Sequence, residues 1–507
     1  MAPPLNPTPA RVTAHPAFAV GPVRRETFGT FVEHLGRCVY TGIYEPGHPT
    51  ADDDGWRGDV LGLTRELGVS TVRYPGGNFV SGYRWEDGIG PKDERPVRLD
   101  LAWHSTETNQ VGLDDFVQWC GRAGVEPMMA VNLGTRGVQE ALDVLEYCNH
   151  PGGTALSDLR RRNGAEEPHG ISFWCLGNEM DGPWQIGHKT PTEYGRLAAE
   201  TARAMRMAGG DALRLVACGS SGPTMDTFGE WERAVLMEAY EFVDYISAHQ
   251  YVENRGSLED HLAAGHLMDR FIREIVAHVD HVRSVLRSAR EVHISFDEWN
   301  VWHMSSRRTP VPSGSDWPEA PELTEDLYTV ADAVVVGDLL ITLLRHTDRV
   351  HAASLAQLVN VIAPIMTAPG GPAWKQTIFH PFALTSAHAR GEVLQLAVDS
   401  PSYTSPQHGL VPALSAVATH DADSGSVTLF AVNRASDTAL PLEADVSAFE
   451  GKRLVEALVF ASDDPLWCAT QEDSSSVLPG PLEGAVLEDG RLTAVLPPVS
   501  WAMLRLG

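Results

Sequence analysis

Short runs of apolar residues recur along the first three-quarters of the chain, and each ends in polar or turn residues before a stretch with helical spacing. Eight such runs lie at residues 28–32, 69–74, 127–131, 171–176, 213–218, 243–247, 292–296 and 352–356. Continuous apolar strands that alternate with amphipathic helices are typical of a parallel sheet covered by helices. Eight units are what a closed (β/α)8 TIM barrel requires, so this α/β fold is our prediction.

The stretches between the runs predict helices. Between residues 113 and 120 the apolar positions recur at i, i+3, i+4 and i+7, and Gly121 and Gly124 supply a stop signal. Longer helices are predicted over residues 260–287 and 327–344. A doubly wound open sheet is the alternative, but it usually carries a glycine-rich phosphate turn after its first strand, and this chain has none there.

After about residue 390 the helical pattern gives way to alternation, as in residues 426–432, and to a further strand-like region over 492–506. This change predicts a C-terminal all-β sandwich domain over residues 389–507. The N-terminal segment, residues 1–27, is too short to fold alone and is expected to add a strand to that sandwich. Residues 28–388 then form the barrel. Residues 301–323 and 364–376 are predicted to be long loops that shape a pocket.

Composition and charge narrow the class of protein. The 507 residues carry 39 basic and 67 acidic side chains, a net charge of −28, so a nucleic-acid partner is not expected. The most apolar stretch, residues 331–344, contains Asp332 and Asp338 and is too short to span a membrane. The first 22 residues lack an apolar signal-peptide core, and the six cysteines show no CxxC spacing. A cytoplasmic protein with reduced cysteines and no membrane partner is therefore expected.

In a TIM barrel the functional residues lie at the carboxyl ends of the strands. Among the carboxylates at such positions, Glu179 follows the fourth strand and Glu298 follows the seventh. Glycoside hydrolysis needs a protonated carboxyl group to protonate the leaving oxygen and an ionised one to attack the anomeric carbon. Other polar residues at strand ends, and the tryptophans that flank the two carboxylates, are Glu33, Asn78, Asn132, Asn178, His249, Tyr251, Gln357, Trp174, Trp184, Trp299 and Trp302.

Each of these residues also has a simpler interpretation. A glutamate at a strand end often serves as a charge at a helix N-terminus, and a tryptophan such as Trp299 can be a core residue. His249 can be structural, and Asn132 can be a turn residue, so Asn132 is left out of the predicted site. Asp52-Asp53-Asp54-Gly55 lacks the spacing of a calcium loop, and no HExxH, P-loop or GxSxG motif is present. No metal site is predicted.

Five segments taken together resemble the signatures of glycoside hydrolase family 51. They are FVEHLG at residues 31–36, RYPGGN at 73–78, WCLGNEMDGPW at 174–184, FDEWN at 296–300 and QLVNVI at 357–362. The family consists principally of retaining exo-α-L-arabinofuranosidases of clan A, in which the acid/base follows strand four and the nucleophile follows strand seven. The resemblance implies that Glu179 is the general acid/base and that Glu298 is the nucleophile.

The resemblance also implies roles for the residues around this pair. Asn178 would bind the sugar 2-hydroxyl, and Arg73 would lie beside the nucleophile. Arg84 stands at a position that varies within the family and would bear on the leaving-group side. His249 would sit next to the nucleophile region. The remaining hydroxyl ligands and pocket walls of the −1 subsite would be Glu33, Asn78, Tyr251, Gln357, Trp103 and Trp302. No cofactor is implied, and family members are commonly hexamers, which implies a homo-oligomer.

Three functions remain open at this point. The first is an intracellular retaining exo-α-L-arabinofuranosidase that acts on arabinan and arabinoxylan oligosaccharides by double displacement, with its carboxyl groups about 5–5.5 Å apart. The second is an endo-β-glucanase or β-xylosidase on the same scaffold, which an open groove would favour. The third is a catalytically silent protein that binds arabino-oligosaccharides, against which the intact carboxylate pair stands.

Overall fold

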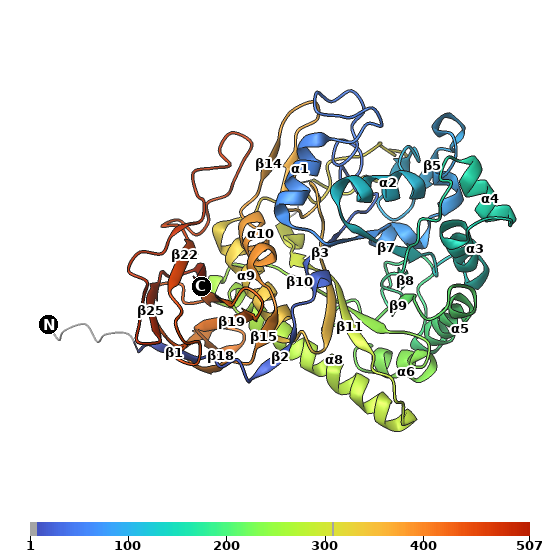
Figure 1. Cartoon of the computed structure of the whole chain (residues 1–507). Coiled ribbons are helices and arrows are strands. Elements are labelled where there is room, and N and C mark those ends of the chain that lie inside the picture. Colours follow the sequence, from blue (N-terminus) through green and yellow to red (C-terminus); the bar gives the residue numbers. More distant parts are fainter. Residues whose placement is uncertain (1–7, 307–308) are drawn as a thin grey trace.

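The protein is described by a computed structural model that covers residues 8–306 and 309–507. A barrel and a β-rich C-terminal domain lie side by side (Figure 1). The barrel is closed by eight parallel strands, so the predicted TIM barrel is confirmed and the open-sheet alternative is wrong. Around the barrel the strands are β3 (Gly29–Phe31), β4 (Thr71–Tyr74), β7 (Glu126–Val131), β8 (Phe173–Leu176), β9 (Arg214–Ala217), β10 (Tyr245–Val252), β11 (His293–Val301) and β12 (Val350–Leu355), and β12 pairs with β3.

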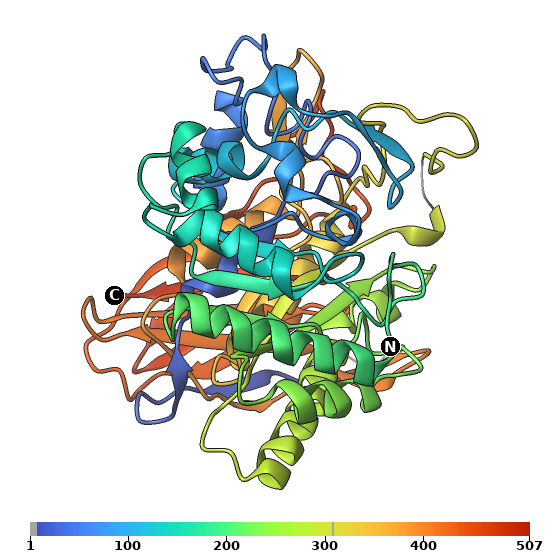
Figure 2. The same cartoon turned by 90° about the vertical axis from the view of Figure 1, so that its right-hand side faces the viewer.

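Helices cover the outside of the barrel (Figure 2). They are α1 (Gly58–Leu67), α2 (Leu113–Ala123), α3 (Val138–Asn149), α4 (Ala155–Arg162), α5 (Pro191–Gly209), α6 (Glu230–Ala239), α7 (Leu258–His261), α8 (Ala264–Leu286), α9 (Val330–Arg345) and α10 (Phe379–His388). The stop signal of α2 is Gly124 alone, which is left-handed with φ 75°, whereas Gly121 lies inside the helix. The single helix predicted over 260–287 is wrong, because Leu262 and Ala263 separate α7 from α8. No helix in the described ranges is long and apolar enough to cross a membrane.

The predicted loops contain more structure than expected. Residues 364–376 include a hairpin of β13 (Ile365–Thr367) and β14 (Ala373–Lys375). The first residue of the 301–323 segment ends β11, and residues 307–308 of that segment lie outside the described residues. A further hairpin of β5 (Arg98–Asp100) and β6 (Ser105–Glu107) was not predicted. Both hairpins are insertions on the side of the barrel where the strands end.

The C-terminal domain is built from two main sheets. The seven-stranded sheet contains β2 (Ala19–Pro22), β15 (Glu392–Leu394), β19 (Leu414–Asp421), β20 (Ser426–Asn433), β26 (Ser500–Leu506), β22 (Leu454–Phe460) and β23 (Gly480–Pro481). The five-stranded sheet contains β16 (Ala397–Asp399), β1 (Ala10–Thr13), β21 (Leu440–Asp445), β25 (Arg491–Leu496) and β24 (Val486–Glu488), and β17 (Ser402–Ser405) pairs with β18 (Gly409–Pro412). The N-terminal segment supplies β1 and β2, and its residues 1–7 lie outside the described part of the chain.

The seven-stranded sheet is buried on both faces. In β20 one face, with Val427 and Leu429, belongs to the sandwich core, and the other face, with Phe430 and Val432, belongs to the barrel's core. The sheet packs on α9, which is buried along nearly its whole length, so apolar residues of β20 occur on both faces of the strand. This packing fixes the sandwich on the barrel.

Candidate active site

The predicted site residues that follow β3, β4, β8, β10, β11 and β12 converge at the carboxyl end of the barrel. His249 in β10 is at the centre and is 2% exposed. Its Nδ1 lies 3.0 Å from Glu179 Oε1 and 3.6 Å from Glu298 Oε2, and its Nε2 lies 3.0 Å from Asp297 Oδ1. Burial alone would lower the pKa of His249, but the neighbouring carboxylates outweigh it and raise this pKa well above its usual value. His249 is therefore a cation held between three carboxyl groups.

Asp297 is a functional residue that the sequence analysis missed. It is 1% exposed and precedes Glu298, so regular strand alternation would place the two on opposite faces. The ladder between β11 and β12 shifts register between Phe296 and Trp299, and such an irregularity lets consecutive side chains turn inward. The position of Asp297 within the FDEWN segment was the one feature of the sequence that could have pointed to it. The register shift itself cannot be recognised from the sequence.

Glu298 is held by two donors. Arg73 Nη1 donates to Glu298 Oε1 at 2.9 Å, and the Tyr251 hydroxyl donates to Oε2 at 2.8 Å. Burial opposes the charge on Arg73, but Asp297 and Glu298 raise the pKa of the guanidinium well above its usual value. Burial likewise raises the pKa of Tyr251, which keeps its proton. The two donors therefore orient the Glu298 carboxylate, and Arg73 supplies its counter-charge.

Glu179 has different surroundings. It follows β8 in a left-handed conformation with φ 44°, and its Oε2 accepts a hydrogen bond from Trp184 Nε1 at 2.7 Å. Burial and the nearby charge of Glu298 raise the pKa of Glu179 above its usual value, although hydrogen bonds from His249 and Trp184 oppose this. One oxygen of Glu179, one oxygen of Glu298 and one nitrogen of His249 all lie within 4.8 Å of one another. The two carboxyl groups therefore lie close together in different surroundings.

Glu33 organises the opposite wall of the site. Trp103 Nε1 and the Phe79 backbone N–H donate to Oε1 at 2.7 and 3.1 Å, and Gln357 Nε2 donates to Oε2 at 3.0 Å. Burial raises the pKa of Glu33 to about 8. A side chain at Gly77, where φ is 61°, would come within 2.1 Å of Glu33, so only glycine fits at this turn.

The remaining predicted residues complete the site. Arg73 Nη2 donates to Asn178 Oδ1 at 2.6 Å, and Asn178 Nδ2 donates to Asn78 Oδ1 at 3.4 Å. The Trp302 ring meets the edge of the Tyr251 ring with centroids 5.0 Å apart. All the predicted site residues are therefore brought together around Glu179 and Glu298.

Other residues singled out by their position at strand ends do not reach the site. Trp174 and Trp299 are fully buried, and Trp174 Nε1 donates to the backbone oxygen of Ile171. Asn132 accepts hydrogen bonds from the backbone N–H groups of Gly134 and Thr135, so it is a turn residue. The simpler interpretation holds for these three residues.

Glu179, His249 and Glu298 have the spacing of metal ligands among the described residues. A histidine must be neutral to ligate a metal, whereas the surrounding carboxylates favour the charged form of His249. Arg73 also places a positive charge on Glu298 at 2.9 Å. The arrangement suits an acid/base and a nucleophile better than it suits a set of metal ligands.

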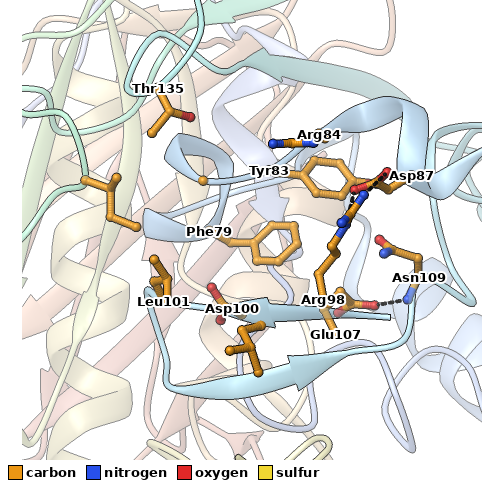
Figure 3. Close-up of a pocket in the computed structure, with 13 residues that line it drawn as sticks. Phe79, Tyr83, Arg84, Asp87, Arg98, Asp100, Leu101, Glu107, Asn109 and Thr135 are labelled. Carbon is orange, nitrogen blue, oxygen red and sulfur yellow. Dashed lines mark hydrogen bonds and ion pairs between the residues drawn. The ribbon is translucent and has the colours of Figure 1, made fainter. Parts of the chain in front are cut away.

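A cavity of about 320 Å³ is lined in part by Phe79 (Figure 3), whose backbone N–H donates to Glu33 Oε1. Its lining includes Arg84, Phe79 and Asp100, and Asp100 accepts a hydrogen bond from the Trp103 backbone at 3.2 Å. Burial raises the pKa of Asp100 to about 6. Arg98 extends toward Asp87 at the rim, with 2.9 Å between Nε and Oδ2. The unpredicted β5–β6 hairpin builds one side, and its sequence signal is the alternation of apolar residues at 97, 99 and 101.

Comparison with known proteins adds to this geometry. The family model of the α-L-arabinofuranosidase 1 domain matches residues 63–270, and that of the α-L-arabinofuranosidase C-terminal domain matches residues 297–500. An intracellular exo-α-(1→5)-L-arabinofuranosidase of Streptomyces lividans is 58% identical over 98% of this chain and 75% of its own length. An exo-α-(1→6)-L-arabinofuranosidase of Bifidobacterium longum is 51% identical over 98% of this chain and 97% of its own. The solved structure of a family 51 α-L-arabinofuranosidase from Bifidobacterium longum has a TM-score of 0.95 at 49% identity and covers 99% of this chain and 100% of that chain.

Proposed function

This chain belongs to the α-L-arabinofuranosidases of glycoside hydrolase family 51, and from that premise we propose that it is a retaining exo-α-L-arabinofuranosidase. It releases terminal L-arabinofuranose from the non-reducing ends of arabinan and arabinoxylan oligosaccharides. The single observation that carries the retaining mechanism is the oxygen of Glu179 within 4.8 Å of an oxygen of Glu298. An inverting pair stands about 6.5–9.5 Å apart because a water molecule must fit between the sugar and the base.

In the first step Glu179 donates its proton to the glycosidic oxygen and Glu298 attacks C1. The bond from C1 to the leaving oxygen breaks, and an ester bond forms between C1 and Glu298. Arg73 and Tyr251 hold the Glu298 carboxylate in position for the attack. Once Glu179 has lost its proton, the cation at His249, 3.0 Å away, stabilises the new carboxylate.

In the second step the ionised Glu179 removes a proton from water as the water attacks C1. The ester bond to Glu298 breaks, Glu298 leaves as a carboxylate, and L-arabinose departs with its original anomeric configuration. Glu179 ends the cycle protonated, so atoms and charges balance. No cofactor enters either step.

The pocket walls support exo action. Glu33 is 1% exposed and is tied to Trp103 and Gln357, which closes the side of the site away from the catalytic pair. We assign the arabinofuranosyl hydroxyls to Glu33, Asn78, Asn178 and Gln357. Hydroxyl ligands that surround one sugar suit a terminal unit and disfavour the endo-acting alternative. Arg84, on the neighbouring cavity, is assigned to the leaving-group side.

The proposal also covers the location, the assembly and the domain division of the enzyme. Relatives 48–58% identical to this chain are named intracellular enzymes, so we place this chain inside the cell, where short oligosaccharides would be its substrates. A homo-oligomer, a hexamer by analogy with the family, is its proposed assembly. The proposed domain division is residues 28–388 for the catalytic barrel and residues 1–27 with 389–507 for the sandwich.

Hydrolysis of aryl α-L-arabinofuranoside by the wild type and by Glu298→Ala tests the function. Loss of the nucleophile should reduce kcat by several orders of magnitude. Glu291→Ala is the matched control, because Glu291 is exposed and pairs with Arg283 outside the site, and it should retain full activity. Aryl β-D-xyloside and β-D-glucoside serve as alternative substrates. Turnover of either one without turnover of the arabinofuranoside would favour the second function, and binding without any turnover would favour the third.

A further inference from the structure

Trp184 is a half-exposed residue whose indole N–H contacts the acid/base. The residue is 52% exposed, yet its Nε1 lies 2.7 Å from Glu179 Oε2. Single apolar side chains are normal on a protein surface. An exposed tryptophan whose one polar atom is directed at a buried carboxyl group is a different case, so this placement points to a role in the reaction.

The loop between β8 and α5 holds the indole in this place. The backbone N–H of Gly182 donates to the carbonyl oxygen of Glu179 at 2.8 Å, and Gln185 Nε2 donates to that of Asn178 at 2.6 Å. A Cβ on Gly182 would come within 2.5 Å of the Trp184 ring, so the ring lies directly against the backbone of this glycine. The contact between Trp184 and Glu179 is therefore built into a tight turn.

Both carboxyl oxygens of Glu179 face nitrogen donors. Oε1 lies 3.0 Å from His249 Nδ1 inside the barrel, and Oε2 accepts the hydrogen bond from Trp184. An indole N–H can only donate, and a charged imidazole donates from both of its nitrogens. Because His249 is buried and occupies Oε1, Oε2 is the oxygen that remains for the leaving group of a substrate.

The titratable groups that face Glu179 come from β10 and β11. They are His249 and Tyr251 of β10 and Glu298 of β11. Burial raises the pKa of Glu179, the hydrogen bond from His249 lowers it, the charge of Glu298 raises it and the hydrogen bond from Trp184 lowers it. Of the two donors that lower this pKa, only Trp184 is exposed, so it is the one that a bound substrate can displace.

The bond from Trp184 depends on the protonation state of Glu179. A carboxylate oxygen is a stronger acceptor than the oxygen of a protonated carboxyl group, so the bond is strongest while Glu179 is ionised. The first step of the reaction needs Glu179 protonated, with Oε2 turned to the leaving oxygen. The leaving oxygen and the indole N–H then compete for the same place, and little packing holds a half-exposed ring there.

We propose that Trp184 is a positioning residue of the acid/base, whose N–H holds Glu179 Oε2 in the free enzyme and is displaced by the leaving oxygen of the substrate. The proposal rests on the role of Glu179 in the proposed function. Trp184 keeps its own proton throughout, and the proton that reaches the leaving oxygen comes from Glu179. Displacement of the indole therefore shifts Glu179 toward its protonated form when a substrate is bound.

The pH dependence of kcat/KM in Trp184→Phe tests the proposal, because phenylalanine keeps a ring and removes the donor. The basic limb of this profile reports the acid of the free enzyme. It should move up by about one pH unit, because the ionised form of Glu179 loses a hydrogen bond. Gly182→Ala keeps Trp184 but pushes its ring away, so it should move the limb in the same direction. Trp467→Phe, at a partly exposed position between β22 and β23, is the matched control and should keep the wild-type profile.

A basic limb that stays in place in Trp184→Phe would overturn the proposal. A fall of kcat/KM by the same factor at every pH would be such a result, and it would show that Trp184 is only a wall of the pocket.

A second arm uses the wild type alone. In a crystal structure with an arabinofuranosyl disaccharide whose glycosidic oxygen is replaced by sulfur, Trp184 Nε1 should lie more than about 3.5 Å from Glu179 Oε2. An unbroken hydrogen bond in this complex would overturn the displacement. Failure of the proposed function is seen separately, as no hydrolysis of aryl α-L-arabinofuranoside by the wild type.

Discussion

Glu179 and Glu298 are the same residue type in one pocket, and their neighbours make them different acids. Glu298 receives hydrogen bonds from Arg73 and Tyr251, whereas Glu179 is buried beside that negative charge. Opposite charge favours the ionised form, and burial and like charge favour the protonated form. The proposed division of roles between nucleophile and acid/base therefore follows from the surroundings of each carboxyl group.

Arg73→Met tests the electrostatic role of the guanidinium. Without it Glu298 loses its donor at 2.9 Å and its buried counter-charge, so the nucleophile is neither oriented nor electrostatically compensated. We expect kcat/KM to fall by about 100-fold or more, because breaking a buried ion pair costs about 3–5 kcal/mol. Arg203→Met, at a largely exposed position on α5, is the control and should leave kcat/KM unchanged. An Arg73→Met variant with the kcat/KM of the wild type would contradict this role.

Glu33 should make stability depend on pH. Burial raises its pKa in the folded protein from 4.5 to about 8, so the folded state binds this proton more tightly than the unfolded state. The stability that Glu33 contributes is complete below about pH 4.5 and is lost as the pH rises through 8. Glu33→Gln keeps the shape without the ionisation. The Tm of this variant should therefore fall less than that of the wild type between pH 5 and 8. Parallel curves of Tm against pH for the two proteins would refute the prediction.

At the scale of elements, two glycines in helices show how packing decides the effect of one methyl group. A Cβ at Gly337 of α9 would come within 2.3 Å of the Trp501 ring, whereas a Cβ at Gly121 of α2 meets nothing within 4 Å. α9 is pressed against the seven-stranded sheet, and α2 is open at that position. The same substitution should therefore have opposite signs in the two helices.

Gly337→Ala is expected to lower the free energy of unfolding by about 1–3 kcal/mol through overpacking. Gly121→Ala is its control and should raise that free energy by about 0.5–1 kcal/mol, because alanine favours the helix. Urea denaturation measures the free energy of unfolding of both variants. A stabilised Gly337→Ala would mean that Trp501 does not pack against α9 as described.

The sequence predicted the elements that are buried evenly along their length. It missed the features that depend on contacts with other parts of the chain. All eight barrel strands were predicted because each contains a short apolar run, as strands of a buried parallel sheet do. The β13–β14 hairpin was taken as a loop because its Pro369-Gly370-Gly371-Pro372 turn dominates the local pattern. The break between α7 and α8 falls at Leu262 and Ala263, which are good helix formers, so tertiary contacts decide it. Asp297 was missed because a register shift, which the sequence does not mark, turns it inward.

At the scale of the whole molecule, the barrel and the sandwich are joined by a buried ion pair as well as by apolar packing. Arg434 of the sandwich donates to both oxygens of Asp338 in α9, at 2.7 and 2.8 Å, and both side chains are almost fully buried. The strands β19, β20 and β26 of the seven-stranded sheet pack on α9 (Figure 1). We infer that the two parts unfold together.

Arg434→Met should therefore destabilise the whole protein. It leaves Asp338 as an uncompensated buried charge, which costs about 3–5 kcal/mol of unfolding free energy. Arg505→Met is the control, because Arg505 and Glu456 form a partly exposed pair that contributes about 0–1 kcal/mol. Calorimetry should show one unfolding transition in each variant. Only in Arg434→Met should this transition move to a much lower temperature. Two separate transitions would contradict the joint unfolding.

The central claim is the double displacement at Glu298, and the anomeric configuration of the first product tests it most directly. Proton NMR during hydrolysis of an aryl α-L-arabinofuranoside by the wild type should show α-L-arabinofuranose first, followed by slow mutarotation. The close carboxyl pair, with oxygens within 4.8 Å, predicts this result. The β-anomer as the first product would mean direct attack by water and would contradict the account.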